Sequence, residues 1–507
     1  MRNRHWFYLI ITTIALASVL LYFNINSNPF LEGPDAYYYA LQAKYWALTG
    51  NVKIPDSSFI HRLVGLLYLA GISVEQALHS WIAISVAIAI FTVALVRFSN
   101  TEPFNTIDGI IFALLLMSPS LLFTAIEFPK MMSMMMVIPL WFLPLIVRKN
   151  YWPLSIIIAL LSSCLHLSAA PLALLFSVTL IIINLARYRR NNFISIATIT
   201  GGTVLAALCC FYFKDRLVNS FSGSHWSAGI TSLFGETGLP LSIIVELIAA
   251  ISIFTYIAIH EWQNKAELRG NILLPLALVI PAIIPWKHEG TMWFGERYAV
   301  MVPFFLLIGA TFIRSNASHN SKGPNKTTRL IILVLLSISV GYSFIKPRYS
   351  HPNYLDPNYP NIDKVVSEIS GKNIPMFIAH KSFAYYYKYR LMKEAFPFEP
   401  EDHWDKTLVW RVLYQISSEE LNSYLDDRCL WNSGLLITLS APDYHLIRED
   451  CWHDMRSKIL ESENIDLYDR TWRTDLNPSK KRPVFLYDKH RNDANEGFPA
   501  LPDHFEK

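Results

Sequence analysis

The feature that most constrains this chain is a succession of long apolar segments separated by short polar loops. A helix needs roughly 20 apolar residues to cross a hydrocarbon core about 30 Å thick. By this criterion the sequence predicts about eleven membrane-spanning helices, and therefore a polytopic α-helical membrane protein. The predicted spans lie near residues 6–24, 76–96, 107–125, 131–147, 152–168, 170–186, 193–212, 240–259, 271–286, 298–313 and 329–345.

The apolar pattern stops after the last predicted span, and the rest of the chain has the polar composition of a water-soluble domain. Only 17% of the 507 residues are charged, although soluble domains average about a quarter. We therefore predict a transmembrane module at residues 1–345 and a soluble mixed α/β domain at residues 346–507. In the second part, Met376–His380 and Gly434–Ser440 have strand-like patterns, and a helix is expected to follow the latter through Asp454.

The distribution of Lys and Arg around the predicted spans gives the orientation of the chain. With the N-terminus inside, the cytoplasmic loops hold about 14 of these cations and the outside loops about 8, as the positive-inside rule requires. We expect a multi-pass protein of the inner (plasma) membrane with a cytoplasmic N-terminus and an extracytoplasmic C-terminal domain. The net charge of +4 is spread among loops without a basic stripe, which argues against a nucleic-acid partner.

Two of the five cysteines, Cys429 and Cys451, lie in the predicted exported domain. An oxidising compartment would permit a disulfide between them, although spacing along the chain does not fix their distance in space. The pair is therefore a candidate disulfide, with two free thiols as the alternative.

Ionisable residues gather in the loops that are predicted to lie outside, at or just above the level of the lipid head groups. The first of these loops, residues 25–71, is long, and its segments 40–48 and 60–69 have the pattern of short amphipathic helices. A charge near the membrane is costly, which makes each of these residues a candidate for function. The candidates are Asp35, His61 and Arg62 in the first loop, Glu127 and Lys130 in the second, and His288, Glu296 and Arg297 in the last.

Two carboxylates differ from the other candidates. Asp35 follows Gly-Pro, precedes a Tyr-rich helical segment and has no obvious local partner, while Glu127 ends a predicted span beside Pro129. Other charged residues have ordinary explanations. Lys44 is expected to extend toward the membrane interface, and Asp56, which lies between Pro and Ser-Ser, is expected to cap a helix. We therefore expect Asp35 and Glu127 to have a functional role.

This layout resembles the GT-C superfamily of integral membrane glycosyltransferases, whose members include the protein O-mannosyltransferases and the aminoarabinose transferase of lipid A. Asp35 in GPDAYYYALQAKYWALTG matches the acidic position of the first outside loop in that family, and Glu127 in EFPK resembles that of the second. Arg297 in GERYAVMVP is similar to an Arg that several members place at the outer start of a late span, facing the lipid phosphate. The resemblance covers residues 1–345. The chain differs from members of the family in having no Asp-x-Asp pair in the second loop and no Trp-Trp-Asp signature in the tail.

The resemblance implies an inverting transfer of a sugar from a polyprenyl-phosphate donor to a lipid, glycan or protein acceptor at the outer face of the membrane. Such a transfer passes through an oxocarbenium-like state and needs a carboxylate to deprotonate or orient the acceptor, the role expected for Asp35. The leaving phosphate carries negative charge that cations must stabilise, the role expected for Arg297, Lys130 and Arg62.

The remaining candidates are expected around the same site. His61, His288 and Glu296 are candidate contacts to the acceptor or to the site itself. A divalent ion such as Mg²⁺ or Mn²⁺ is a candidate cofactor, with Asp35 and Glu127 as its ligands, because hard cations take carboxylate oxygens.

Three other functions remain open at the level of sequence. A polymerase or ligase of surface polysaccharide would depend chiefly on His and Arg in outside loops, such as His61, Arg62 and His288. A transporter or flippase of lipid-linked saccharides would place polar residues in the middle of the membrane and show repeats or broken spans, and no clear repeat is present. A sensor or scaffold would bind a partner through its tail.

Overall fold

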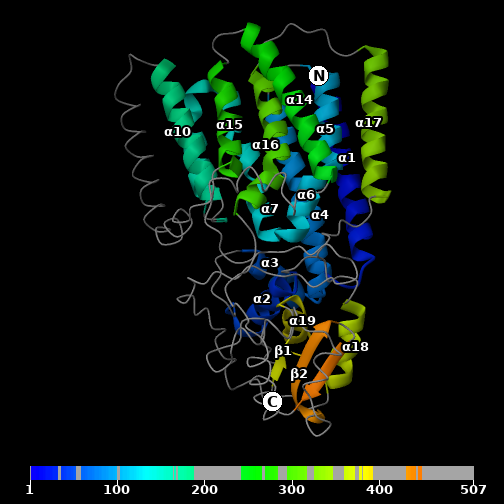
Figure 1. The fold of residues 1–507 in the computed structure, drawn as a ribbon. Helices are drawn as coiled ribbons and strands as arrows, with labels where there is room; N and C mark the ends of the chain where they lie inside the picture. Colours follow the sequence, from blue (N-terminus) through cyan, green and yellow to red (C-terminus); the bar gives the residue numbers. More distant parts are fainter. Residues whose placement is uncertain are drawn as a thin grey trace, which may run out of the picture. The chain divides into compact units, whose positions relative to one another are not determined.

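A computed structural model describes most of the apolar helices and part of the rest of the chain (Figure 1). Two compact units are formed, Met1–Ser27 with His79–Tyr349, and Asn28–Leu78 with Ser350–Lys507. The helix α4 (Val74–Phe98) contributes residues to both units. The described residues are 2–31, 36–52, 59–99, 103–163, 165–166, 169–187, 241–264, 269–283, 294–316, 325–345, 359–370, 376–378, 381–391, 430–440 and 443–447.

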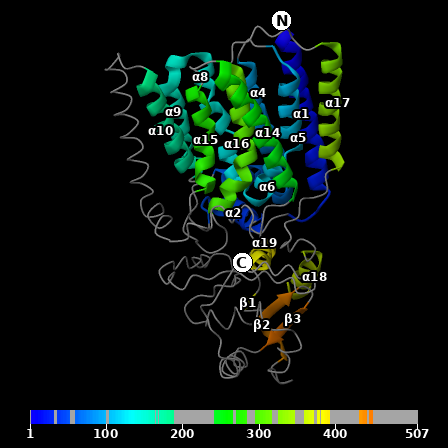
Figure 2. The same cartoon turned by 45° about the horizontal axis from the view of Figure 1, so that its top comes forward.

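The first unit consists of helices in its described part. Figure 2 shows α9 and α10 along one side of this unit and α1 and α17 along the other, with α16 between them. The helices other than α4 are α1 (Arg2–Asn26), α5 (Thr106–Met117), α6 (Pro119–Glu127), α7 (Pro129–Met135), η1 (Ile138–Trp141), α8 (Leu143–Val147), η2 (Lys149–Tyr151), α9 (Trp152–Ser162), α10 (Ala169–Arg187), α14 (Leu241–Asn264), α15 (Arg269–Ile283), α16 (Phe294–Asn316) and α17 (Lys326–Ile345).

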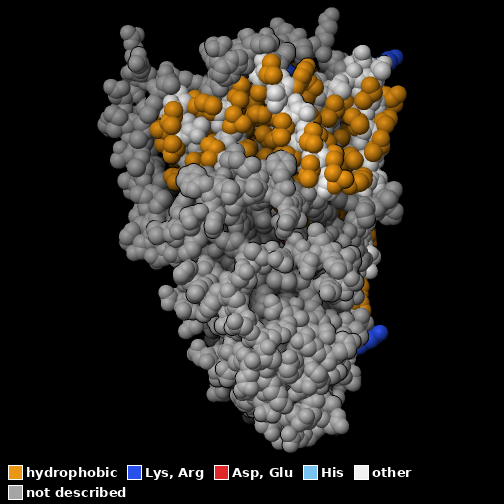
Figure 3. Space-filling model, in the orientation of Figure 1, with side chains coloured by type: hydrophobic (Ala, Val, Ile, Leu, Met, Phe, Trp, Pro, Cys, Tyr) orange, Lys and Arg blue, Asp and Glu red, His pale blue; other side chains and the backbone are white. Residues whose placement is uncertain are grey.

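Six helical segments in the described part of the chain are long and apolar enough to cross a membrane. They are Arg4–Asn26, Val74–Phe98, Thr106–Glu127, Pro129–Val147, Leu241–Ile259 and Tyr298–Ser315. Hydrophobic side chains also cover the described part of this unit on the face that Figure 3 shows. Exposed side chains of this kind include Ile248 and Ile251 of α14 and Val334 and Ile338 of α17. Such a surface is suited to lipid rather than water. The chain is therefore a membrane protein, while the count of eleven spans remains a prediction, and the expected span 193–212 lies outside the described residues.

Two predicted spans are broken rather than continuous. The segment expected at 107–125 is interrupted at Ser118, where the backbone leaves the helical region before Pro119 starts α6. The segment expected at 131–147 is divided into α7, η1 and α8. Proline causes these breaks because it lacks an amide hydrogen and restricts the residue before it, so a helix ends there and the next begins.

The helix α16 forms the core of the first unit. It packs against α14, α15, α5 and α6, and nearly every side chain between Tyr298 and Ser315 is buried. Gly309 permits the closest of these contacts, since a β-carbon at this position would come within 2.3 Å of Pro275 on α15. A small residue at a helix crossing allows two backbones to approach closely, as is common in membranes.

The second unit contains helices and a three-stranded sheet. The strand order is β1-β2-β3, with β1 parallel to β2 and β3 antiparallel to it. Met376 of β1 lies opposite Leu435 of β2, and Leu436 of β2 lies opposite Leu446 of β3. The elements other than the start of α4 are α2 (Ala36–Thr49), α3 (Ile60–Leu69), α18 (Tyr359–Ile369), β1 (Met376–Ile378), α19 (Lys381–Leu391), β2 (Leu430–Ser440) and β3 (Asp443–Ile447).

The strands expected at Met376–His380 and Gly434–Ser440 are present as β1 and within β2. The helix expected after Ser440 is wrong, because Asp443–Ile447 pairs with β2 as a strand instead. A strand has two edges of backbone groups to pair, and β2 pairs with β1 along one edge and with Asp443–Ile447 along the other. Because most of residues 346–507 lie outside the described part, a single mixed α/β domain there remains a prediction, as do the two predicted domain limits.

Candidate functional site

The second-loop carboxylate predicted from sequence lies where one short helix ends and the next begins. Glu127 is the last residue of α6, and its side chain is only 2% exposed. Phe128 is outside the helical region, with φ −131° and ψ 59°, and Pro129 starts α7. Lys130 follows on the first turn of α7 and is half-buried. A carboxylate and a cation therefore lie three residues apart at the end of a broken span.

This junction is tied to α4. The indole Nε1 of Trp81 donates a hydrogen bond to the carbonyl oxygen of Pro129 at 3.1 Å. Proline at the start of a helix has no amide hydrogen to leave unsatisfied, which suits Pro129 to the first position of α7. The bond from Trp81 fixes the turn that carries Glu127 and Lys130.

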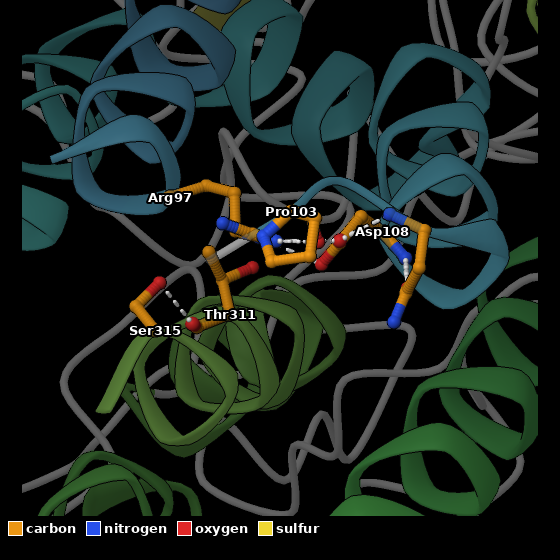
Figure 4. A network of polar contacts seen from close by, with 6 residues as sticks. Arg97, Pro103, Asp108, Thr311 and Ser315 are labelled. Atoms are coloured by element: carbon orange, nitrogen blue, oxygen red, sulfur yellow. Dashed lines mark hydrogen bonds and ion pairs between the residues drawn. The ribbon is translucent and has the colours of Figure 1, made fainter. Parts of the chain in front are cut away.

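The opposite end of α4 holds a buried ion pair (Figure 4). The Nε and Nη2 atoms of Arg97 donate to the two carboxylate oxygens of Asp108 at 2.8 and 2.7 Å, and both side chains are 1% exposed. Arg97 Nη2 also donates to the carbonyl oxygen of Pro103, and the amide of Asn105 donates to Asp108. Asn105 and Asp108 form a capping box at the start of α5. These contacts stabilise the predicted cytoplasmic end of the span and lie far along α4 from Trp81.

The direction of α16 follows from the same region. Figure 4 shows Thr311 and Ser315, in the last part of α16, beside Arg97 and Pro103. Because α16 also packs against α5 and α6, it runs antiparallel to them. Its first turn, which contains Glu296 and Arg297, is therefore placed toward the end of α6 that carries Glu127. The side chains of Glu296 and Arg297 lie outside the described residues.

A second carboxylate, which sequence reasoning missed, lies at the start of α6. Glu246 of α14 is 4% exposed and receives three hydrogen bonds from the break between α5 and α6. Ser118 Oγ donates to Oε1 at 2.5 Å, Ser120 Oγ to the same atom at 3.1 Å, and the Ser120 amide to Oε2 at 2.8 Å. The signal in the sequence was a lone acid within the apolar run 241–259.

In the second unit, His61 is buried within the first loop, which was predicted to lie outside. Its side chain is 1% exposed, and its ring lies 6.1 and 6.0 Å from the rings of Tyr38 and Tyr39 on α2. Arg62, the next residue of α3, is exposed. The two candidates therefore differ in environment: His61 packs between α2 and α3, and Arg62 can reach a ligand in solvent.

The same unit joins α2 to α19. Lys44 donates from Nζ to the carbonyl oxygen of Tyr389 at 3.0 Å, and Tyr389 donates from its hydroxyl to Glu75 at 2.7 Å. Burial lowers the pKa of Lys44. Lys44 is therefore part of the packing within the unit, which corrects the expectation that it extends to the membrane interface.

The tyrosines at this contact are strongly desolvated. Burial raises the pKa of Tyr389, and the negative charge of the neighbouring Glu75 raises it further. Burial also raises the pKa of Tyr37 and Tyr386, and Tyr386 donates a short hydrogen bond to Asp363. Burial raises the pKa of Tyr387 to about 12. The side chains of the aromatic segment Tyr385–Tyr389 are buried, so they form packing contacts within the unit rather than an exposed binding surface.

The remaining predicted site residues are not placed. Asp35, His288, Cys429 and Cys451 lie outside the described residues, so the candidate disulfide and the first-loop carboxylate remain predictions. Within the described part of the chain, no group of three or more His, Cys, Asp or Glu side chains is arranged to hold a metal ion. The metal site expected at Asp35 and Glu127 therefore also remains a prediction.

Comparisons with known proteins give a likeness to solved structures only. No family model and no curated protein matches the chain. Among solved structures, it is similar to the arabinofuranosyltransferase AftD from Mycobacteria, determined by single-particle cryo-EM, with 14% sequence identity and a TM-score of 0.43. The match covers 74% of this chain but only 30% of AftD. A likeness at this level decides neither the family nor the activity.

Proposed function

We propose that this chain is a GT-C-type glycosyltransferase that moves a sugar from a polyprenyl-phosphate donor to an acceptor at the outer face of the membrane. The observation that carries the proposal is the buried carboxylate of Glu127 at the end of a broken span, three residues before Lys130. A buried acid at the end of an apolar span is a costly arrangement, and such residues usually serve function.

The residue types suit the chemistry of glycosyl transfer. Glu127 is suited to orient the acceptor or a catalytic cation, and Asp35 is the proposed base that accepts the proton of the acceptor hydroxyl as the new glycosidic bond forms. The bond between the sugar and the lipid phosphate breaks in the same step, with inversion at the sugar carbon. Lys130, Arg297 and the exposed Arg62 are the proposed contacts to the departing phosphate, and Arg can bind two phosphate oxygens at once.

Transfer of labelled sugar tests the proposal. Purified protein is incubated with a panel of polyprenyl-phosphate sugars and with lipid, glycan and peptide acceptors, and Glu127→Gln and Asp35→Asn are assayed beside the wild type. Both variants should lose at least about 100-fold in rate, Asp35→Asn because the base is lost and Glu127→Gln because the acceptor or cation is no longer oriented. Asp363→Asn is the matched control. Asp363 of α18 is hydrogen-bonded to Tyr386 and Arg390 of α19 and is not a proposed site residue. This control should retain transfer.

The alternatives predict different outcomes of the same assay. A polysaccharide polymerase or ligase would tolerate both carboxylate changes and lose activity in His61→Ala or Arg62→Ala. A transporter or flippase would bind or move the lipid-linked sugar without transferring it. Addition of a metal chelator gives the cofactor requirement, since a site that uses Mg²⁺ or Mn²⁺ would lose activity and regain it when the ion is restored.

A further inference from the structure

The break between α5 and α6 is contacted by a buried carboxyl group, that of Glu246. A helix that starts inside a membrane leaves amide hydrogens without partners, and no water is available to satisfy them. Here Ser118 caps α6 by accepting from the amide of Leu121 at 3.1 Å. The carboxylate of Glu246 accepts from the amide of Ser120 and from both serine hydroxyls. The start of α6 is thus attached to α14.

We propose that Glu246 is a positioning residue for the reaction, which it serves by fixing the helix whose last residue is Glu127. This inference rests on the proposed glycosyltransferase function. The helix α6 has nine residues, so Glu246 and Glu127 are at its opposite ends, about 13 Å apart along the axis.

The charge of Glu246 suits this place. The N-terminus of a helix carries a partial positive charge, and an anion there is stabilised, more strongly where water is excluded. Hydrogen bonds to an ionised acceptor are also about twice as strong as neutral ones. An apolar residue would leave the amide of Ser120 and the two hydroxyls without acceptors, and a bulky one would force α6 away from α14. A carboxylate satisfies all three donors in one contact.

A shift at the start of α6 would move Glu127, because the helix is held at both ends and along its length. Its start is bonded to α14, the residue after its end leads into Pro129, which is bonded to Trp81, and its side packs on α16. Every residue of α6 is buried. If the start of α6 shifts, the helix has no exposed side along which to relax, and the shift reaches Glu127. A displacement of about 1 Å in a catalytic group can reduce the rate by about 100-fold.

Glu246→Gln is the variant that tests the proposal. The glutamine has the same shape but a single oxygen acceptor and no charge, so in either orientation of its amide it cannot accept from the Ser120 amide and from both serine hydroxyls at once. We expect kcat for sugar transfer to fall by about tenfold or more while KM stays within about twofold, because the substrate contacts are unchanged. Amide hydrogen exchange in the peptide that contains Ser120–Ile126 should become at least about tenfold faster, since the start of α6 is loosened.

Asp108→Asn is the matched control. Asp108 is equally buried and accepts hydrogen bonds at the start of α5, but it lies at the other end of this broken span from Glu127. The control should lower thermal stability, leave kcat per folded molecule within about twofold and leave exchange in α6 unchanged. An equal loss of kcat per folded molecule in both variants would show that Glu246 is merely structural and would overturn the proposal.

The two proposals fail in different ways. If the wild type transfers sugar and Glu246→Gln keeps its kcat, the positioning role is wrong and the glycosyltransferase remains. If the wild type transfers no sugar from any donor, the proposed function fails, and with it the role of Glu246 in that reaction. Hydrogen exchange still tests whether Glu246 holds α6 in place. Exchange in α6 that is the same in Glu246→Gln and in the wild type would show that it does not.

Discussion

Trp81 donates its indole hydrogen to the carbonyl oxygen of Pro129 at 3.1 Å, and so joins α4 to the turn that follows Glu127. Both groups are buried, and the carbonyl would have no water to replace the indole. Trp81→Phe should therefore destabilise the protein by about 1–3 kcal/mol from the unpaired carbonyl, in addition to the lost packing. Thermal unfolding in detergent measures the change.

Trp141→Phe separates packing from hydrogen bonding in that measurement. Trp141 is fully buried in η1, and its Nε1 atom has no hydrogen-bond partner in the described structure. The same substitution there removes volume without breaking a bond. Trp81→Phe should be the more destabilising of the two, and equal effects would show that the bond to Pro129 contributes nothing measurable.

Arg97 and Asp108 form a pair whose members depend on one another. Removal of one partner leaves the other as an unpaired buried charge, which typically costs about 3–5 kcal/mol. Arg97→Met should therefore strongly lower the unfolding temperature. The double variant Arg97→Met/Asp108→Leu should recover much of the loss, because no unpaired charge remains. A double variant as unstable as the sum of the two single ones would contradict this account.

Two glycines of the helical unit allow a paired test of packing. A β-carbon at Gly309 would lie 2.3 Å from Pro275, whereas one at Gly341 would meet nothing within 4 Å. Gly309→Ala should separate α16 from α15 and destabilise by about 1–3 kcal/mol. Gly341→Ala should be neutral or stabilising by up to about 1 kcal/mol, because alanine favours a helix. Unfolding of the two variants under the same conditions gives the comparison.

The sequence predicted the elements that depend on local pattern. Apolar runs of sufficient length gave the helices α1, α4, α14 and α17, and alternation gave β1 and part of β2. The break at Ser118 and the strand β3 were missed. A span with one proline is still apolar throughout, and hydropathy does not register where its hydrogen bonds are interrupted. The pairing of β3 depends on a neighbour in space rather than on its own residues.

The candidate site was only partly predictable for the same reason. Glu127 is recognisable because an acid at the end of an apolar run is rare, and the structure buries its side chain. Glu246 is equally recognisable as an acid within an apolar run. Its structural role, however, depends on Ser118 and Ser120 at the start of another helix, which donate hydrogen bonds to it. Lys44 was misjudged because its acceptor, the carbonyl of Tyr389, is 345 positions away. A sequence shows which charged residues are costly to bury, but it does not show which residues will lie close enough to bind them.

The tyrosines of the second unit predict its response to alkali. Burial raises the pKa of Tyr37, Tyr386 and Tyr389 above the usual value of about 10. Above pH 10 the unfolded chain releases these protons and the folded unit retains them. Stability is therefore fully present below pH 10 and is lost as pH rises beyond it, because the folded state binds more protons in that range.

Absorbance of the phenolate and near-UV circular dichroism, recorded together against pH, test this prediction. The buried phenols should ionise only as the folded signal is lost, so the two curves should coincide for this group. In Tyr389→Phe, which removes one such phenol and its hydrogen bond to Glu75, stability should be lower by about 1 kcal/mol at neutral pH. It should also fall less steeply above pH 10, since one fewer proton is released on unfolding. An unchanged slope would show that Tyr389 ionises in the folded state and is not held in the desolvated contact between α2 and α19.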